Sequence, residues 1–262
     1  MFRDRKAVLL DLEGVLYAGR EALPGARETM EEVRRRGIPH LFITNISYMR
    51  AGEVAAHMEA LGLPASPDKI VSALECAGEI VRRLYGSGRA LVVGGGPLRD
   101  VLEEAGFEVA GPGEEEGADL VVVSRDDGLT YRSLSAAARA VAAGARFAAL
   151  NPDVRAPLEG GGFELGCGAV VKAIEAAAGK RAAILGKPAP HLFGAALERL
   201  GVTLREAVMV GDNLRTDIAG AAALGMGSVW INRWGRLPGD PQVQPDLEVG
   251  RVDEILPHLP GG

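Results

Sequence analysis

Short apolar runs alternate with helical stretches along the whole chain. Each run is rich in Val, Ile, Leu or Ala and ends at a turn, after which apolar residues recur at helical spacing. This alternation predicts parallel βα units, because parallel strands are buried on both faces and are joined by helical crossovers. The predicted strands are 6–12, 40–44, 90–93, 120–123, 147–150, 182–185, 207–210 and 228–231. The predicted helices include 26–36, 51–61, 133–143, 169–178 and 191–200.

Length and composition indicate a globular α/β protein and exclude several classes of function. The 262 residues suffice for one large domain, or for a core domain with a smaller second one. A net charge of −6, with no basic run interleaved with aromatics, argues against nucleic-acid binding. Cys76 and Cys167 lack the spacing of a zinc site, which favours a reducing, cytoplasmic setting. The apolar run at 7–10 is too short for a signal or a membrane span, so no membrane partner is expected.

The first predicted strand leads into a pair of acidic residues. In open α/β sheets ligands bind at the carboxyl ends of the strands, so the residues just after each strand are the most informative about function. Asp11 stands at the end of this strand, Glu13 follows two residues later, and Gly14 permits a sharp exit. A carboxylate in this place is suited to nucleophilic attack, although a turn with solvent-facing acids explains the fragment alone equally well.

Polar residues also follow the strands at 40–44 and 182–185. Thr44 and Asn45 offer a hydroxyl and backbone N–H donors that suit a phosphoryl oxygen, although such residues also occur as plain helix caps. Lys187 stands between Gly186 and Pro188, close to a predicted helix start. An ammonium held there can neutralise a phosphate dianion that approaches a carboxylate, whereas the simpler alternative is a surface lysine.

Two further carboxylates, Asp212 and Asp217, flank the turn after the strand at 207–210. Carboxylate oxygens are the ligands of hard divalent cations such as magnesium. Asp217 has a second explanation, because an acidic residue in the first turn of a helix complements the helix dipole.

Together, these residues resemble the four motifs of the haloacid dehalogenase superfamily. A strand-end Asp, a strand-end Thr, Lys-Pro before a helix and Gly-Asp-x-x-x-Thr-Asp occur in that order and span nearly the whole chain. The stretches 126–131, 151–153 and 166–169 are similar to landmarks of the type II (C2) cap of the NagD-like phosphatases. The resemblance implies a Rossmann-like three-layer parallel sheet core at 1–72 and 182–262, with an inserted α/β cap at 73–181.

The resemblance also implies a chemistry, that of a phosphatase dependent on Mg²⁺ which hydrolyses a small phosphomonoester through an aspartyl-phosphate on Asp11. The expected metal ligands are Asp11, the backbone carbonyl of Glu13 and Asp212, with Asp217 ordering the metal waters. Lys187 is expected to supply further positive charge.

The same resemblance implies substrate contacts in two parts of the chain. Thr44 and the Asn45 amide are expected to hold phosphoryl oxygens. Asn151, Asp153 and Arg155 are candidates for contacts to the rest of the substrate, and the alternative is that they only shape the cap fold. A homodimer is expected, since caps of this kind often form dimers.

One residue departs from the family pattern. The family's Asp-x-Asp has a second aspartate that protonates the leaving alcohol and then activates water, and here that residue is Glu13. The acidity hardly changes, because the side-chain pKa values differ by about 0.4. The extra methylene changes position, and a misplacement of roughly 1 Å can cost about a hundredfold in rate. We expect Glu13 to retain the acid–base role.

Three other classes of protein share part of this pattern. A phosphate-ester sensor that binds magnesium but turns over weakly is supported only by Glu13. A receiver-type switch phosphorylated on a strand-end Asp needs no cap of this size. A dinucleotide-binding site would use the glycines at 94–96, but Arg99 replaces the third fingerprint glycine.

Overall fold

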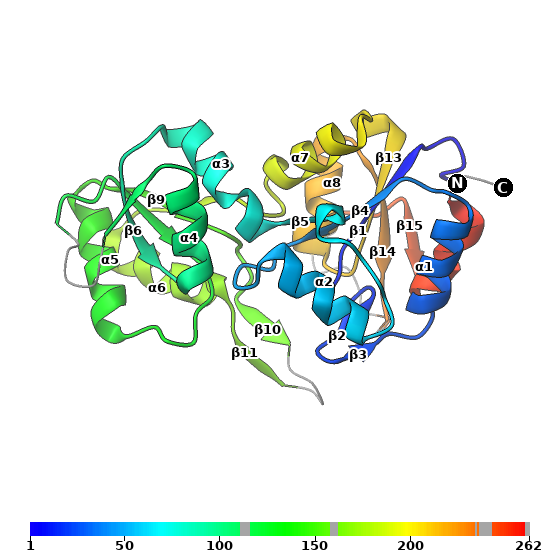
Figure 1. The fold of residues 1–262 in the computed structure, drawn as a ribbon, viewed down its shortest axis with the longest axis horizontal. Helices are drawn as coiled ribbons and strands as arrows, with labels where there is room; N and C mark the ends of the chain where they lie inside the picture. Colours follow the sequence, from blue (N-terminus) through cyan, green and yellow to red (C-terminus); the bar gives the residue numbers. More distant parts are fainter. Residues whose placement is uncertain (111–115, 158–161, 234, 236–242, 260–262) are drawn as a thin grey trace. The chain divides into compact units, whose positions relative to one another are not determined.

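The computed structural model describes residues 1–110, 116–157, 162–233, 235 and 243–259 (Figure 1). The chain divides into two compact units. Unit 1 comprises Met1–Thr44, Ala51–Val71 and Lys187–Gly262, and unit 2 comprises Asn45–Arg50 and Ser72–Gly186. Each unit is built around its own parallel sheet.

The sheet of unit 1 has six strands in the order β15-β14-β13-β1-β4-β5. The pairings from β15 through to β4 are all parallel. Every residue of β1, β13 and β14 is buried, as expected for a parallel sheet covered on both faces. The strands are β1 (Ala7–Leu10), β4 (His40–Thr44), β5 (Ile70–Ser72), β13 (Ala207–Gly211), β14 (Gly227–Ile231) and β15 (Leu247–Val249).

The helices of unit 1 cover both faces of this sheet, with α1 and α8 on opposite sides in Figure 1. A small antiparallel hairpin, β2 (Tyr17–Ala18) with β3 (Glu21–Ala22), follows the turn after β1. The helices are α1 (Ala26–Arg35), α2 (Ala51–Ala60), α7 (Pro190–Leu200) and α8 (Ala219–Leu224), with a π-helical turn at Leu214–Ile218 and 3₁₀ turns at Pro67–Lys69, Leu204–Glu206 and Val252–His258.

The sheet of unit 2 has five parallel strands in the order β12-β9-β8-β6-β7. Helices α3 and α4 pack against each other, as do α5 and α6, and an antiparallel hairpin pairs β10 with β11. The elements are α3 (Ala73–Tyr85), β6 (Arg89–Val93), α4 (Gly96–Glu104), β7 (Glu108–Val109), β8 (Leu120–Val123), α5 (Tyr131–Ala143), β9 (Arg146–Ala149), β10 (Arg155–Pro157), β11 (Phe163–Leu165), α6 (Cys167–Ala178) and β12 (Ala183–Ile184).

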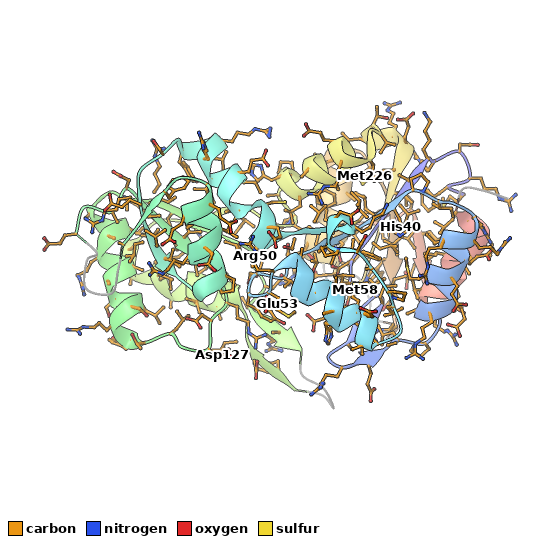
Figure 2. The ribbon with its side chains drawn as sticks, in the orientation of Figure 1. His40, Arg50, Glu53, Met58, Asp127 and Met226 are labelled. Carbon is orange, nitrogen blue, oxygen red and sulfur yellow. The ribbon has the colours of Figure 1, made fainter. Side chains whose placement is uncertain are left out.

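The short segment Asn45–Arg50 directly follows β4 of unit 1, but it contacts helices of unit 2. The Arg50 side chain (Figure 2) lies 3.1 Å from a carboxylate oxygen of Glu75 on α3 and 3.1 Å from one of Glu104 on α4. The Leu74 amide donates a hydrogen bond to the Ile46 carbonyl over 3.3 Å. These contacts are consistent with the assignment of Asn45, the residue after Thr44, to unit 2.

The predicted fold class, α/β with parallel sheets, is confirmed. The strand predicted at 182–185 forms as β12, but it pairs with β9 and so belongs to the sheet of unit 2. The helix expected near Pro188 begins two residues later, at Pro190. Every helix of the described residues is too short or too polar to cross a lipid bilayer.

Candidate active site

Lys187 lies at the centre of a buried group of polar atoms in unit 1. Its ammonium donates hydrogen bonds to Asp11 Oδ1 over 2.8 Å and to the Ile43 carbonyl over 2.9 Å. It also lies 2.7 Å from Asp217 Oδ1. Lys187 is only 1% exposed, so the interpretation as a surface lysine is wrong. Three segments far apart in the sequence therefore meet at one ammonium.

Asp11 follows β1 directly, and its backbone amide donates to the Val210 carbonyl of the neighbouring strand β13. Parallel pairing of β1 with β13 and of β1 with β4 brings the ends of these strands to one edge of the sheet. Thr44, the last residue of β4, is 2% exposed at this edge. The polar residues predicted from the ends of these strands therefore share one edge, as parallel topology requires.

Asp212 is held against the turn that follows Asp11. The indole N–H of Trp230, on the adjacent strand β14, donates to the Asp212 carbonyl over 2.9 Å. Gly14 has φ +89°, and a Cβ there would overlap the Asp212 carboxylate. Only glycine combines this backbone conformation with so close an approach, so Gly14 brings the turn and the Asp212 carboxylate together.

Asp217 is fully buried in the π-helical turn that precedes α8. The Asn213 amide donates to Asp217 Oδ2 over 3.1 Å, while Oδ1 lies next to the Lys187 ammonium. Such π-turns are rare and occur often at functional sites. Since Oδ1 faces the buried Lys187 ammonium and Oδ2 accepts from the Asn213 amide, a role as a complement to the helix dipole alone does not account for Asp217.

The electrostatics of this group show an excess of negative charge. Burial raises the pKa of Asp11 well above its usual value; Lys187 opposes this shift, and the carboxylates of Asp217 and Asp212 add to it. Burial and Asp217 raise the pKa of Asp212 to about 7. Burial lowers the pKa of Lys187, but Asp11 and Asp217 more than offset that effect and raise it overall. One ammonium thus faces more carboxylates than it can neutralise.

A divalent cation fits this arrangement. One carboxylate oxygen each from Asp11, Asp212 and Asp217 lie within 4.8 Å of one another. Buried carboxylates in excess of their cationic partners are costly unless a cation or a proton compensates them. An all-oxygen donor set is the kind that hard divalent ions take.

Glu13 is half-buried beside this group. It forms a backbone bridge with Tyr17, and its charge contributes to the raised pKa of Asp212. The Glu13 carboxylate therefore lies close enough to Asp212 to influence its charge state.

The remaining predicted residues lie in unit 2. The Asn45 side-chain amide donates to Asp153 Oδ2 over 3.0 Å, and the Asn151 side-chain amide donates to the Asn45 carbonyl over 2.7 Å. Arg155, on β10, is exposed and places its guanidinium 4.2 Å from the centre of the Phe163 ring. Asn45, Asn151 and Asp153 thus form one hydrogen-bonded group, whereas Arg155 makes its described contact elsewhere.

Gly94 and Gly95 form the turn between β6 and α4, and Gly96 is the first residue of α4. A cavity of about 350 Å³ lies there, at the carboxyl ends of β6 and β8. Its polar lining includes Ser47, Ser124 and Arg125. Arg125 lies over the Tyr48 ring, 4.9 Å from its centre.

Sequence reasoning missed several groups that shape the site. The Ile43 carbonyl, which accepts from Lys187, carries no residue-type signal because every residue has a carbonyl. Trp230 contacts Asp212 because the register of β13 with β14 sets Gly211 opposite Trp230. Only Gly14 had a signal, its place in a turn after a strand-end Asp, and that signal did not indicate contact with Asp212.

Comparison with known proteins identifies the family. Residues 8–108 match the family described as haloacid dehalogenase-like hydrolase, and residues 184–247 match a second family described as HAD-hydrolase-like. The acid sugar phosphatase of Staphylococcus aureus (strain MRSA252) is 32% identical over 226 residues, 86% of each chain. NagD of Escherichia coli K-12 is 30% identical with a TM-score of 0.84, covering 96% of this chain and 98% of NagD. The 4-nitrophenylphosphatase of Thermotoga maritima is 27% identical with a TM-score of 0.87, covering 98% of both chains.

The chain therefore belongs to the haloacid dehalogenase-like hydrolases. NagD and nitrophenylphosphatases are among its structural neighbours. The predicted family, with its NagD-like character, is confirmed.

Proposed function

We propose that this protein is a magnesium-dependent phosphatase that hydrolyses a small phosphomonoester through an aspartyl-phosphate on Asp11. The class of activity, phosphomonoester hydrolysis, is supported by relatives named acid sugar phosphatase and 4-nitrophenylphosphatase. One observation carries the proposal. The carboxylates of Asp11, Asp212 and Asp217 lie close to one another, and the Lys187 ammonium contacts two of them, Asp11 and Asp217.

Magnesium would be held by Asp11, Asp212 and the Glu13 carbonyl. The contacts of Asp217 with Lys187 and with the Asn213 amide support an indirect role for this residue, in which it orients Lys187 and orders water around the ion. When bound, the ion neutralises negative charge on the phosphoryl oxygens. Burial and the Asp217 carboxylate raise the pKa of Asp212, and a bound cation would lower that pKa again by stabilising the ionised carboxylate.

The chain's own residues carry the chemical steps. Lys187 neutralises the approaching phosphate, while Thr44 and the Asn45 amide hold its oxygens. An Asp11 carboxylate oxygen attacks phosphorus, and the ester P–O bond breaks as Glu13 gives a proton to the leaving alcohol. Glu13, now ionised, takes a proton from the water that attacks the aspartyl-phosphate. Inorganic phosphate leaves and the Asp11 carboxylate is restored.

We further propose that residues 73–181 form the inserted cap and that 1–72 with 182–262 form the core. The two compact units and their separate sheets support this division, although β12 pairs within the sheet of unit 2. A homodimer and a cytoplasmic location stay predictions, as do direct substrate contacts by Asn151, Asp153 and Arg155.

The test is a panel of phosphomonoesters assayed with magnesium and with a chelator. The panel contains an aryl phosphate, several hexose phosphates, a nucleoside monophosphate and phosphoglycolate. The proposal predicts phosphate release that requires the metal and that is lost in Asp11→Asn. Metal-dependent ligand binding without phosphate release from any ester would instead favour the sensor.

A further inference from the structure

Asn45 is clamped by two residues that are more than a hundred positions away in the sequence. Its carbonyl accepts a 2.7 Å hydrogen bond from the Asn151 side-chain amide, and its own side-chain amide donates a 3.0 Å bond to Asp153 Oδ2. The ring closes because the Asp153 backbone amide donates to Asn151 Oδ1 over 3.1 Å. We call these three residues the Asn45 clamp.

The loop that carries the clamp is itself held firmly at the start of α6. The Gly168 amide donates to the Asp153 carbonyl over 2.8 Å, and the Gly166 amide donates to the Val154 carbonyl over 3.1 Å. A Cβ on Gly168 would overlap the Pro152 carbonyl, so this helix start approaches the loop as closely as the backbone allows. The backbone of the clamp loop is therefore fixed independently of any substrate.

The far side of the Asn45 side chain is also enclosed. A Cβ on Gly186 would collide with Asn45 Oδ1, so glycine is required there. Gly186 is followed directly by Lys187. The Asn45 side chain thus lies between the clamp loop and the backbone that leads into the catalytic lysine.

We propose that Asn151 and Asp153 are positioning residues, which fix Asn45 so that its backbone amide is held ready for a phosphoryl oxygen. This inference rests on the proposed function, which assigns that amide to the phosphate. Both polar groups of the Asn151 side chain have protein partners, and the residue is 6% exposed. The Asn151 side chain is therefore oriented toward Asn45 and Asp153 and not toward a leaving group.

A positioning role and a leaving-group contact predict different kinetics. If the clamp orders the phosphate site, its loss affects every phosphomonoester equally, because all of them share the phosphoryl group. If Asp153 or Asn151 instead contacts the leaving group, the loss depends on which leaving group is present.

The experiment compares Asp153→Ala, Asp153→Asn and Asn151→Ala with the parent enzyme. We measure kcat/KM for an aryl phosphate, a hexose phosphate and a nucleoside monophosphate, and inhibition by inorganic phosphate. Asp153→Ala and Asn151→Ala should lower kcat/KM on the order of tenfold for all three esters, and should weaken phosphate inhibition by a similar factor. Asp153→Asn should recover most of the loss, since its amide oxygen still accepts from Asn45.

Asp100→Ala is the matched control, because it removes an exposed carboxylate from α4 of the same unit and should change nothing. A loss that differs more than about tenfold between esters would overturn the proposal in favour of a leaving-group contact. Unchanged kinetics in Asp153→Ala and Asn151→Ala would also overturn it. A parent enzyme that hydrolyses no ester would contradict the proposed function itself. An active parent whose variants behave in either of these two ways would contradict only this inference, so the two failures are distinguishable.

Discussion

The Lys187 ammonium donates a 2.8 Å hydrogen bond to Asp11 Oδ1, and both residues are buried. A carboxylate without this partner would be more strongly protonated, because burial already raises the pKa of Asp11. The bond therefore favours the ionised form of Asp11, which is the form able to attack phosphorus.

Replacing Lys187 by Met should remove this effect while preserving most of the side-chain volume. We expect kcat/KM to fall by about 10²–10³-fold, since a preorganised cationic group is lost. The free energy of unfolding at pH 8 should fall by about 3 kcal/mol, because buried carboxylates lose their partner. Steady-state kinetics and urea denaturation measure the two effects. Lys172→Met, at an exposed position on α6, is the control, and equal effects of the two substitutions would contradict the account.

Asp212 gives the metal-free protein a specific pH dependence. Its pKa is raised to about 7, so the native protein binds the proton more tightly than the unfolded chain does. This proton's contribution to the free energy of unfolding is fully present below the unfolded-state pKa of about 3.9. It is lost as the pH rises through about 7, the pKa in the folded protein. Magnesium competes with that proton, so the increase in Tm that magnesium gives over a chelator should be larger at pH 8 than at pH 5. An equal increase at both pH values would contradict this prediction.

Glu13 is expected to act as general acid and base. Glu13→Gln should lower turnover by about 10²–10⁴-fold, because the amide can neither give nor take the proton. Glu13→Asp should retain more activity than Glu13→Gln, since it keeps a titratable carboxyl. The comparison uses kcat for an ester with a poor leaving group, where protonation matters most. If Glu13→Gln turns over normally, another group carries the proton.

Gly14 is expected to matter for metal binding as well as for the backbone. Gly14→Ala introduces a Cβ into the Asp212 carboxylate and should weaken magnesium binding at least about tenfold, because a ligand is displaced. Gly37→Ala is a matched control, since Gly37 has φ +64° but no atom within 4 Å of an added Cβ. Both variants should lose about 1 kcal/mol from backbone strain. Calorimetric magnesium titration separates them, and similar affinities would show that contact with Asp212 is unimportant.

Much of the site could be predicted from the sequence because it depends on strand ends. Asp11, Thr44 and Asp212 each follow a recognisable apolar run, and parallel pairing brings such positions together. Lys187 was predicted from its neighbours Gly186 and Pro188, but its complete burial was not.

The rest of the site depends on contacts that have no local signal. The bonds from Asn45 to Asn151 and Asp153 join residues 106 and 108 positions apart, and nothing in a short window indicates them. The strand at 182–185 was predicted correctly, yet an apolar run does not reveal which sheet it will join. Trp230 reads simply as a buried strand residue until the register with β13 is known.

The central claim is that Asp11 becomes phosphorylated during turnover. The direct test is to mix the enzyme with magnesium and a labelled aryl phosphate, quench with acid during turnover, and reduce any acyl phosphate with borohydride before peptide mass spectrometry. The account predicts homoserine at position 11. It should form only when substrate is present, and its amount should be reduced in Lys187→Met in proportion to the lost activity. An enzyme that releases phosphate at full rate with residue 11 still aspartate under every quench condition, or with the label on another residue, would contradict it.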